Sequence, residues 1–151
     1  MGLYALLAFD GGARASRKPS AHASCVWSNS GKLLWWTASA VHPCATNNEM
    51  EAMGLLTGLR WLLRHYRSVP IHVIGDSAII INMASATYRV SANNLRPVIR
   101  DIRDLLPLFR QVTLQAVPCV YNVAADGLCN WIMDMQLSPI TTLRKSADDT
   151  A

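Results

Sequence analysis

An apolar run that stops at a carboxylate is the feature that most limits how this chain can fold. Residues 3–9 (LYALLAF) are nearly all apolar, and Asp10-Gly11-Gly12 follows at once. Such a run is typical of a β-strand that is covered on both faces. We therefore expect a buried strand over residues 3–9 with a carboxylate at its end.

The next segments predict an antiparallel opening and then a change of architecture. Residues 22–28 and 33–40 are predicted strands joined by the hairpin turn Asn29-Ser30-Gly31-Lys32. Thr46-Asn47-Asn48-Glu49 matches a capping box, and apolar residues continue at helical spacing to about Tyr66. A short strand over residues 71–74 then closes at Gly75-Asp76-Ser77, which gives a second carboxylate at a strand end.

The second half alternates helices with one strand. We expect helices over residues 77–85, about 95–106 and 122–135, and a fifth strand over residues 111–117. The order βββαβααβα predicts an α/β fold with a mixed five-stranded sheet flanked by helices. Residues 1–135 are expected to form one domain, and the polar residues 136–151 a flexible tail.

Composition excludes several classes of protein. The 151 residues are 51% hydrophobic and 16% charged, which favours a compact domain over a disordered chain. Apolar stretches fall far short of the roughly 20 residues that span a bilayer, and no secretory signal is recognised, so we expect an intracellular protein, cytoplasmic or nuclear. The four cysteines fit neither a zinc site nor a disulfide framework. The net charge of +4 suits a polyanionic partner without proving one.

Four carboxylates stand out by their context. Two follow predicted strands and two lie near predicted helix starts: Asp10, Asp76, Glu51 and Asp126. In the proposed sheet these groups can converge, and such a cluster repels itself unless a hard cation such as Mg²⁺ neutralises it. Two such ions can activate water against a phosphodiester. Each residue also has a simpler interpretation, since Asp10-Gly11 alone suggests a turn and Asp76 a helix N-cap.

Four segments of the chain, in their order and spacing, resemble the motifs of the ribonuclease H type I family. The matching segments are Phe9-Asp10-Gly11-Gly12-Ala13, Thr46-Asn47-Asn48-Glu49-Met50-Glu51-Ala52, Gly75-Asp76-Ser77 and Asn122-Val123-Ala124-Ala125-Asp126-Gly127-Leu128. The resemblance runs from about residue 3 to residue 134. It implies a ribonuclease H-like fold and a metal-dependent endonuclease that hydrolyses the RNA strand of RNA–DNA hybrids with two Mg²⁺ ions, Mn²⁺ being the alternative.

The resemblance also implies a set of site residues. The catalytic metal ligands would be Asp10, Glu51, Asp76 and Asp126. The substrate-binding set would comprise the backbone of the first motif, the asparagine pair, a serine for phosphate and the asparagine that opens the last helix: Gly11, Gly12, Ala13, Asn47, Asn48, Ser77 and Asn122. Recognition would take place in the minor groove, where 2′-hydroxyls distinguish RNA from DNA.

Some features depart from the family pattern. Residues 17–20 contain no glycine, residues 118–125 contain no histidine, and no long basic insertion separates the two middle helices. The chain therefore resembles the compact branch of the family that lacks a basic handle. Arg96, Arg100 and Arg103 recur on one helix face, which we interpret as a solvated face supported by Asp101 and Asp104; the alternative is that they replace some of the missing binding charge.

Other functions remain open at this point. A non-catalytic module of the same fold would bind nucleic acid or protein, but such a module has little reason to keep four clustered carboxylates. A transposase-like strand-transfer enzyme is disfavoured by Asn47-Asn48, which belong to hybrid recognition. We expect a monomer or one domain of a larger polyprotein, either free-standing or from a retroelement.

Overall fold

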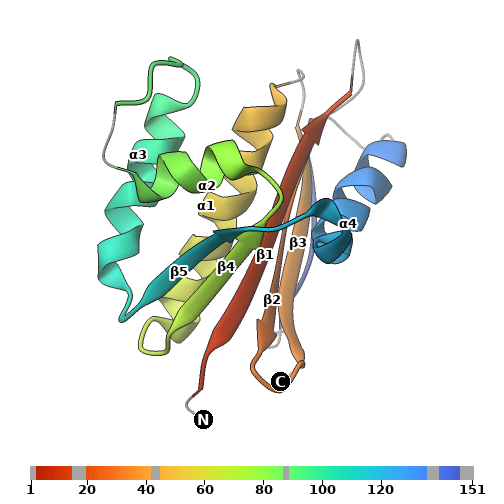
Figure 1. Ribbon diagram of the computed structural model, residues 1–151. Coiled ribbons are helices and arrows are strands. Elements are labelled where there is room, and N and C mark those ends of the chain that lie inside the picture. Colours follow the sequence, from red (N-terminus) through yellow and green to blue (C-terminus); the bar gives the residue numbers. More distant parts are fainter. Residues whose placement is uncertain (1–2, 15–19, 42–44, 87–88, 136–139, 147–151) are drawn as a thin grey trace.

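A single six-stranded sheet organises the chain (Figure 1). The computed structural model describes residues 3–14, 20–41, 45–86, 89–135 and 140–146, the last segment by its backbone. The strands are β1 (Ala5–Ala13), β2 (Ser20–Ser28), β3 (Leu33–Val41), β4 (Ile71–Gly75), β5 (Val112–Ala116) and β6 (Ile140–Ser146). Their order is β5-β4-β1-β2-β3-β6, with β1, β4 and β5 parallel and the other pairs antiparallel. The predicted mixed five-stranded sheet is thus confirmed, and β6 extends it at the β3 edge.

The helices form one layer on each face of the sheet. Their bounds are α1 (Asn47–Tyr66), α2 (Ala78–Ser85), α3 (Arg96–Leu105) and α4 (Val123–Asp134), with short 3₁₀ turns at Leu106–Leu108 and Cys119–Tyr121. Helices α1, α2 and α3 lie on one side of the sheet, and α4 packs alone against β1, β2 and β3 on the other (Figure 1). None of the described helices is long and apolar enough to cross a membrane.

Strand alternation gives the two faces of the sheet different cores. Leu7 and Phe9 of β1 belong to the large core beneath α1, whereas Ala8 between them packs on the α4 side. The α4 side is lined by small residues of β2 and β3, which let the helix come close: Ala21, Ala23, Ala38 and Ala40. Both faces of β1 are therefore covered, as its continuous apolar run predicted.

The capping box that begins α1 is confirmed in both directions. The Thr46 hydroxyl accepts a hydrogen bond from the Glu49 backbone N–H at 3.1 Å, and the Glu49 carboxylate accepts one from the Thr46 N–H at 3.4 Å. This reciprocal pair satisfies two backbone donors that a helix start leaves open. It fixes where α1 begins and hence which residue of its first turns faces the sheet.

Strand β1 does not stop at Asp10, as the sequence suggested, but continues to Ala13. The two glycines lie inside the strand, and Gly11 is required by packing: a Cβ there would collide with the backbone of Met50 and Glu51 in α1. The parallel pairing with β4 nevertheless ends at Ala8, opposite Ile74. Asp10 therefore lies just beyond the point where β1 and β4 separate.

Part of the predicted C-terminal tail forms a strand of the sheet. Residues 140–146 pair antiparallel with the outer edge of β3, from Val41 opposite Ile140 to Trp35 opposite Ser146. An unpaired edge of β3 offers a row of backbone donors and acceptors, so even a polar segment gains hydrogen bonds by adding to it. This strand was not predicted from the sequence, while the flexibility of the tail stays a prediction and residues 136–139 and 147–151 lie outside the described residues.

Candidate active site

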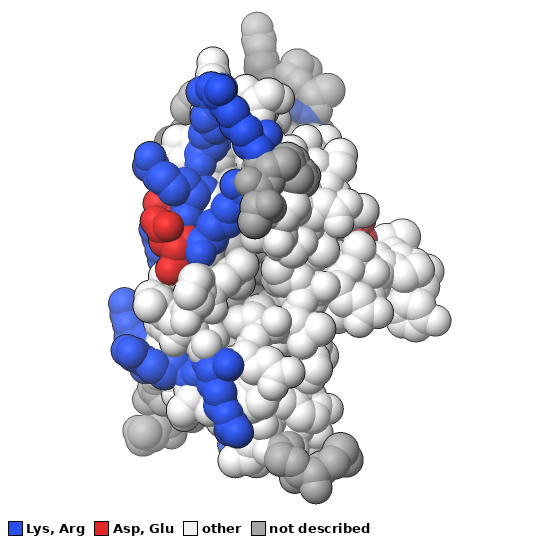
Figure 2. All heavy atoms as spheres, turned by 60° about the vertical axis from the view of Figure 1, so that its left-hand side comes forward, with Lys and Arg blue, Asp and Glu red and all other residues white. Residues whose placement is uncertain are grey.

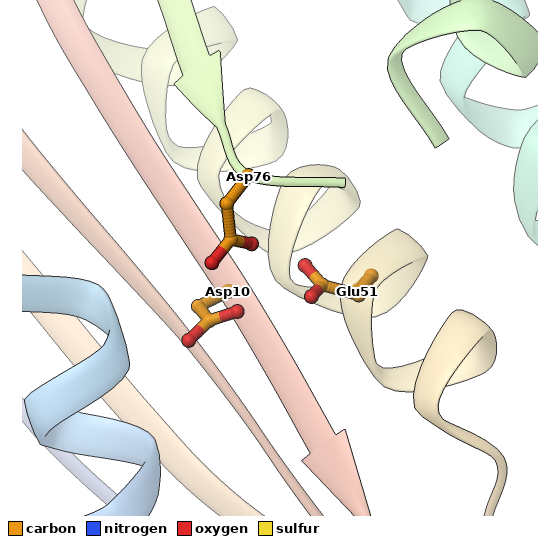
Figure 3. Close-up of side chains that lie close together, drawn as sticks. All are labelled: Asp10, Glu51 and Asp76. Atoms are coloured by element: carbon orange, nitrogen blue, oxygen red, sulfur yellow. The ribbon is translucent and has the colours of Figure 1, made fainter. Parts of the chain in front are cut away.

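Three of the four predicted carboxylates meet at one end of the central strands. Asp10 comes from β1, Glu51 from α1, and Asp76 follows the last residue of β4 (Figure 3). One oxygen from each lies within 4.8 Å of the other two. Their side chains point toward one another although the residues lie 25 to 66 positions apart in the sequence (Figure 3). The convergence of these three carboxylates, which the sequence led us to expect, is confirmed.

Close contacts with glycines hold the three elements together. A Cβ at Gly54 in α1 would lie 2.6 Å from the Asp10 carbonyl oxygen, so the helix rests directly on the β1 backbone beside the carboxylate. Gly75, which precedes Asp76, is packed against the Phe9 ring in the same way. Small residues at these points let α1 and β4 approach β1 closely enough for the carboxylates to meet.

Burial makes this cluster electrostatically costly. Asp10 is 4% exposed and Glu51 9% exposed, and each has a raised pKa. Burial raises the pKa of Asp10 to about 7, with the charge of Asp76 adding to the rise. Burial and then the charge of Asp10 raise the pKa of Glu51 to about 10. Burial also raises the pKa of Asp76, and the nearby Asp126 contributes.

The residues present fit a hard divalent cation. Glu51 Oε2 is buried and has no hydrogen-bond partner among the described residues, which is unfavourable for a carboxylate oxygen in a folded protein. The donor set consists of carboxylate oxygens, the ligand type that Mg²⁺ and Mn²⁺ prefer. A cation bound here would offset the repulsion among the carboxylates and would give Glu51 Oε2 a partner.

Asp126 borders this group without being part of the set of three. It is exposed on the first turn of α4, and its side chain contributes to the raised pKa values of Asp10 and Glu51. Asn130, one turn later, donates from Nδ2 to Asp126 Oδ2 at 3.3 Å. Sequence reasoning missed Asn130, although its i+4 spacing from Asp126 was a signal that could have identified it.

Arg14 is a second residue that the sequence did not point to. It forms an ion pair with Asp134 at 2.6 Å and donates from Nη2 to the Asn130 carbonyl at 3.5 Å. The residue that follows β1 is thereby joined to α4, the helix that carries Asp126. No local pattern links residue 14 to residue 134, so only the folded chain reveals this contact.

The predicted substrate-binding residues lie around the carboxylates in two ways. Asn47 is exposed at the start of α1, and its Oδ1 accepts a hydrogen bond from the Ala13 N–H at 2.7 Å. Asn48, Gly11 and Gly12 are half-buried beside it. The end of β1 and the start of α1 therefore form one continuous surface next to the cluster. The Asn47 side-chain nitrogen takes no part in the bond that its oxygen accepts.

Two other predicted residues have structural duties. Ser77, not Asp76, is the N-cap of α2, because its hydroxyl accepts from the Ile80 N–H at 3.3 Å. The capping interpretation of Asp76 is thus wrong, and its carboxylate remains available to the cluster. Asn122 makes no side-chain cap; it is 1% exposed and donates from Nδ2 to the Phe9 carbonyl at 2.8 Å. This bond ties α4 to β1, and the substrate contact expected of Asn122 stays a prediction.

Comparison with known proteins gives the family. A family model described as reverse transcriptase-like matches residues 8–132, which is most of the chain and a range that includes all four carboxylates. The N-terminal RNase H domain of Rv2228c from Mycobacterium tuberculosis, solved as a fusion with maltose-binding protein, superposes with a TM-score of 0.81 at 26% identity. That alignment covers 89% of this chain and 96% of the other. The chain belongs to the ribonuclease H type I family.

Other members of the family agree in fold. RNase H1 from the halophilic archaeon Halobacterium salinarum NRC-1 gives a TM-score of 0.79 at 25% identity, covering 87% of this chain and 98% of that one. LC11-RNase H1, solved in complex with an RNA/DNA hybrid, gives 0.79 at 22% identity, with 89% and 99% covered, and supports the fold alone. The bifunctional protein Rv2228c of M. tuberculosis is 27% identical over 125 residues, 83% of this chain. The chain spans about a third (34%) of the length of that relative.

Proposed function

We propose that this chain is a divalent-metal-dependent endonuclease that hydrolyses the RNA strand of RNA–DNA hybrids. The observation that carries the proposal is the meeting of Asp10, Glu51 and Asp76 within 4.8 Å, from three separate elements, at a site where Asp10 and Glu51 are buried. Membership of the ribonuclease H type I family supports the same substrate. LC11-RNase H1, a protein of the same fold, has been solved with such a hybrid.

We assign the four carboxylates to metal binding. Asp10, Glu51, Asp76 and Asp126 would hold two Mg²⁺ ions, or Mn²⁺, and bound ions would supply the positive charge that activates water and stabilises the leaving oxygen of a phosphodiester. Asp126 is exposed on α4, so a nucleic acid could reach it. Asn130 orients Asp126 through its Nδ2 hydrogen bond, and Arg14 holds that turn of α4 against the end of β1.

Recognition of the hybrid is assigned to the surface beside the cluster. The Asn47 amide group, Asn48 and the backbone of Gly11 and Gly12 would contact the minor groove, where the 2′-hydroxyls of RNA are presented. The Ala13 N–H already donates to Asn47, so Ala13 would act by fixing Asn47 rather than by binding substrate itself. The Ser77 hydroxyl, which caps α2 as an acceptor, keeps its own proton for a phosphate oxygen.

A cleavage assay with matched duplexes tests the proposal. A labelled RNA strand is presented as hybrid or as double-stranded RNA, and a labelled DNA strand as double-stranded DNA, each with Mg²⁺, with Mn²⁺ and with a chelator. We expect cleavage of the hybrid alone, only with metal, and loss of cleavage in Asp10→Asn. Metal-dependent binding of the hybrid without cleavage would instead identify a non-catalytic module, and cleavage of double-stranded DNA would identify another nuclease class.

A further inference from the structure

A pocket lined by arginines lies on the α3 side of the molecule, away from the carboxylates. We call this cavity of about 380 Å³ the arginine pocket, and four of its lining residues are arginines: Arg89, Arg96, Arg100 and Arg103, together with Val90, Ile99 and Asp104. Figure 2 shows this side, where Lys and Arg side chains gather around one acidic patch. The concave shape distinguishes the group from a row of solvated charges on a convex helix.

Backbone carbonyls hold two of these arginines in place. Arg96 donates from Nε to the Val90 carbonyl at 2.9 Å, and Arg103 donates from Nε to the Met83 carbonyl at 2.9 Å. Each bond fixes the plane of the guanidinium group and hence the direction of its terminal nitrogens. A guanidinium group that is already oriented loses less rotamer entropy when it binds an oxyanion.

The acidic residues of α3 do not neutralise the pocket. Asp101, which the sequence suggested as a support for the arginines, instead pairs with Arg60 of α1 at 3.7 Å. No carboxylate among the described residues lies within ion-pair distance of Arg89, Arg96 or Arg100. Four arginines therefore face one aspartate, and the interpretation of a face balanced by both Asp101 and Asp104 is wrong for Asp101.

Both walls of the pocket connect to elements of the candidate active site. Asn94, in the segment between Arg89 and Arg96, donates to Glu49 Oε1 at 2.8 Å at the start of α1. Met83, which anchors Arg103, lies in α2, whose N-cap Ser77 follows Asp76. Six residues of helix separate Ser77 from Met83, about 9 Å at 1.5 Å per residue, so the pocket begins roughly 10 to 20 Å from the carboxylates.

We propose that the arginine pocket binds backbone phosphates of the nucleic-acid duplex at a distance from the cleaved bond. The inference rests on the proposed function. Three of its arginines lie at positions i, i+4 and i+7 of α3 and extend over about 10 Å along the helix. This length exceeds what one phosphate needs. It suits a nucleic-acid strand, which carries a charge about every 3.4 Å along its axis. By the same spacing, the contact lies about three to six base pairs from the carboxylates.

Paired substitutions test this site against net charge alone. In the double variant Arg89→Gln/Arg100→Gln, both changed side chains are exposed and make no hydrogen bond among the described residues, so folding should be retained. The control is Arg64→Gln/Arg67→Gln, at two exposed positions at the end of α1. Each double variant removes two positive charges from the +4 of the parent, leaving +2. Thermal melts check that both remain folded.

Affinity is measured by fluorescence anisotropy in chelator with labelled hybrids of about 6 and about 18 base pairs, over a range of salt. Loss of two phosphate contacts should weaken binding of the long hybrid about 10- to 50-fold near 0.1 M salt and lower the salt slope by about two. Binding of the short hybrid should change less than about threefold, and the control should lose much less on the long one. Cleavage with Mg²⁺ should show the loss in KM rather than in kcat.

Equal losses in the two double variants, or equal losses on short and long hybrids, would overturn the arginine pocket while leaving the proposed function intact. A parent that cleaves hybrid and a pocket variant with unchanged affinity would do the same. A parent that neither binds nor cleaves hybrid would refute the proposed function and this site together. Preferential loss of binding to the long hybrid in the pocket variant is the result that supports it.

Discussion

Replacing Glu51 by Gln should make the metal-free protein more stable while it abolishes cleavage. Burial and the charge of Asp10 raise the pKa of Glu51 from 4.5 to about 10, so the folded protein retains a proton there that the unfolded chain releases near neutral pH. About 3 pH units separate 4.5 from a working pH of about 7.5, and at about 1.4 kcal/mol per unit this costs up to about 4 kcal/mol of folding free energy.

Gln has nearly the shape of the protonated side chain and does not ionise, so it removes this cost. Allowing for an imperfectly paired amide, we expect a gain of about 2 to 4 kcal/mol in the free energy of unfolding, or roughly 5 to 15 °C in Tm for a domain of this size. The assay is a thermal or urea melt in chelator at about pH 7.5, for the parent and for Glu51→Gln. The control is Glu49→Gln, the same change two residues earlier, where Gln can also serve the capping box and little change is expected.

The same two proteins are then melted with Mg²⁺ and assayed for hybrid cleavage. Mg²⁺ should raise the Tm of the parent and have much less effect on Glu51→Gln, whose neutral amide is a poorer ligand. A metal-free Glu51→Gln protein that is no more stable than the parent would refute the account of a buried, repelling carboxylate. A variant that cleaves hybrid as fast as the parent would remove Glu51 from the metal site.

Three further predictions address the same cluster. Asp76→Asn should lower cleavage at least about 100-fold, since a metal site supplies several kcal/mol of charge stabilisation, while its metal-free Tm equals or exceeds that of the parent; an active variant would show that Asp76 is no ligand. Gly11→Ala should lower the free energy of unfolding by about 3 kcal/mol or more, because the new Cβ collides with the α1 backbone, whereas Gly12→Ala, where the nearest atom is 3.6 Å away, should be tolerated in the same urea titration. If the two alanine variants unfold alike, the close approach of α1 to β1 is not what Gly11 provides. Finally, because burial raises the pKa of Asp10 to about 7 and of Glu51 to about 10, the folded metal-free protein binds more protons than the unfolded chain near neutrality. Its free energy of unfolding should therefore fall as the pH rises from about 6.5 to about 8, by up to about 1.4 kcal/mol per pH unit for each retained proton, and a flat or rising series of urea melts would contradict this.

Local signals in the sequence determined the order of the elements and the identity of the carboxylates. The capping box from Thr46 to Glu49 fixes the start of α1 with bonds between residues three positions apart, so no tertiary information is needed to find it. The apolar run before Asp10 and the short apolar segment before Asp76 likewise predict, from neighbouring residues alone, that each carboxylate follows a buried strand. Alternation and helical spacing are local properties, and they were enough to predict the mixed sheet.

Tertiary structure alone decided what depends on contacts between distant segments. Asn122 looks like an N-cap in the sequence, yet its amide bonds to the Phe9 carbonyl 113 positions away. Asp101 lies among the arginines of α3 but pairs with Arg60 on α1, and residues 140–146 become a strand because the edge of β3 is available to them. The raised pKa values of Asp10 and Glu51 also depend on the folded chain. Burial and neighbouring charges shift the pKa of a carboxyl group only after folding has brought the groups together.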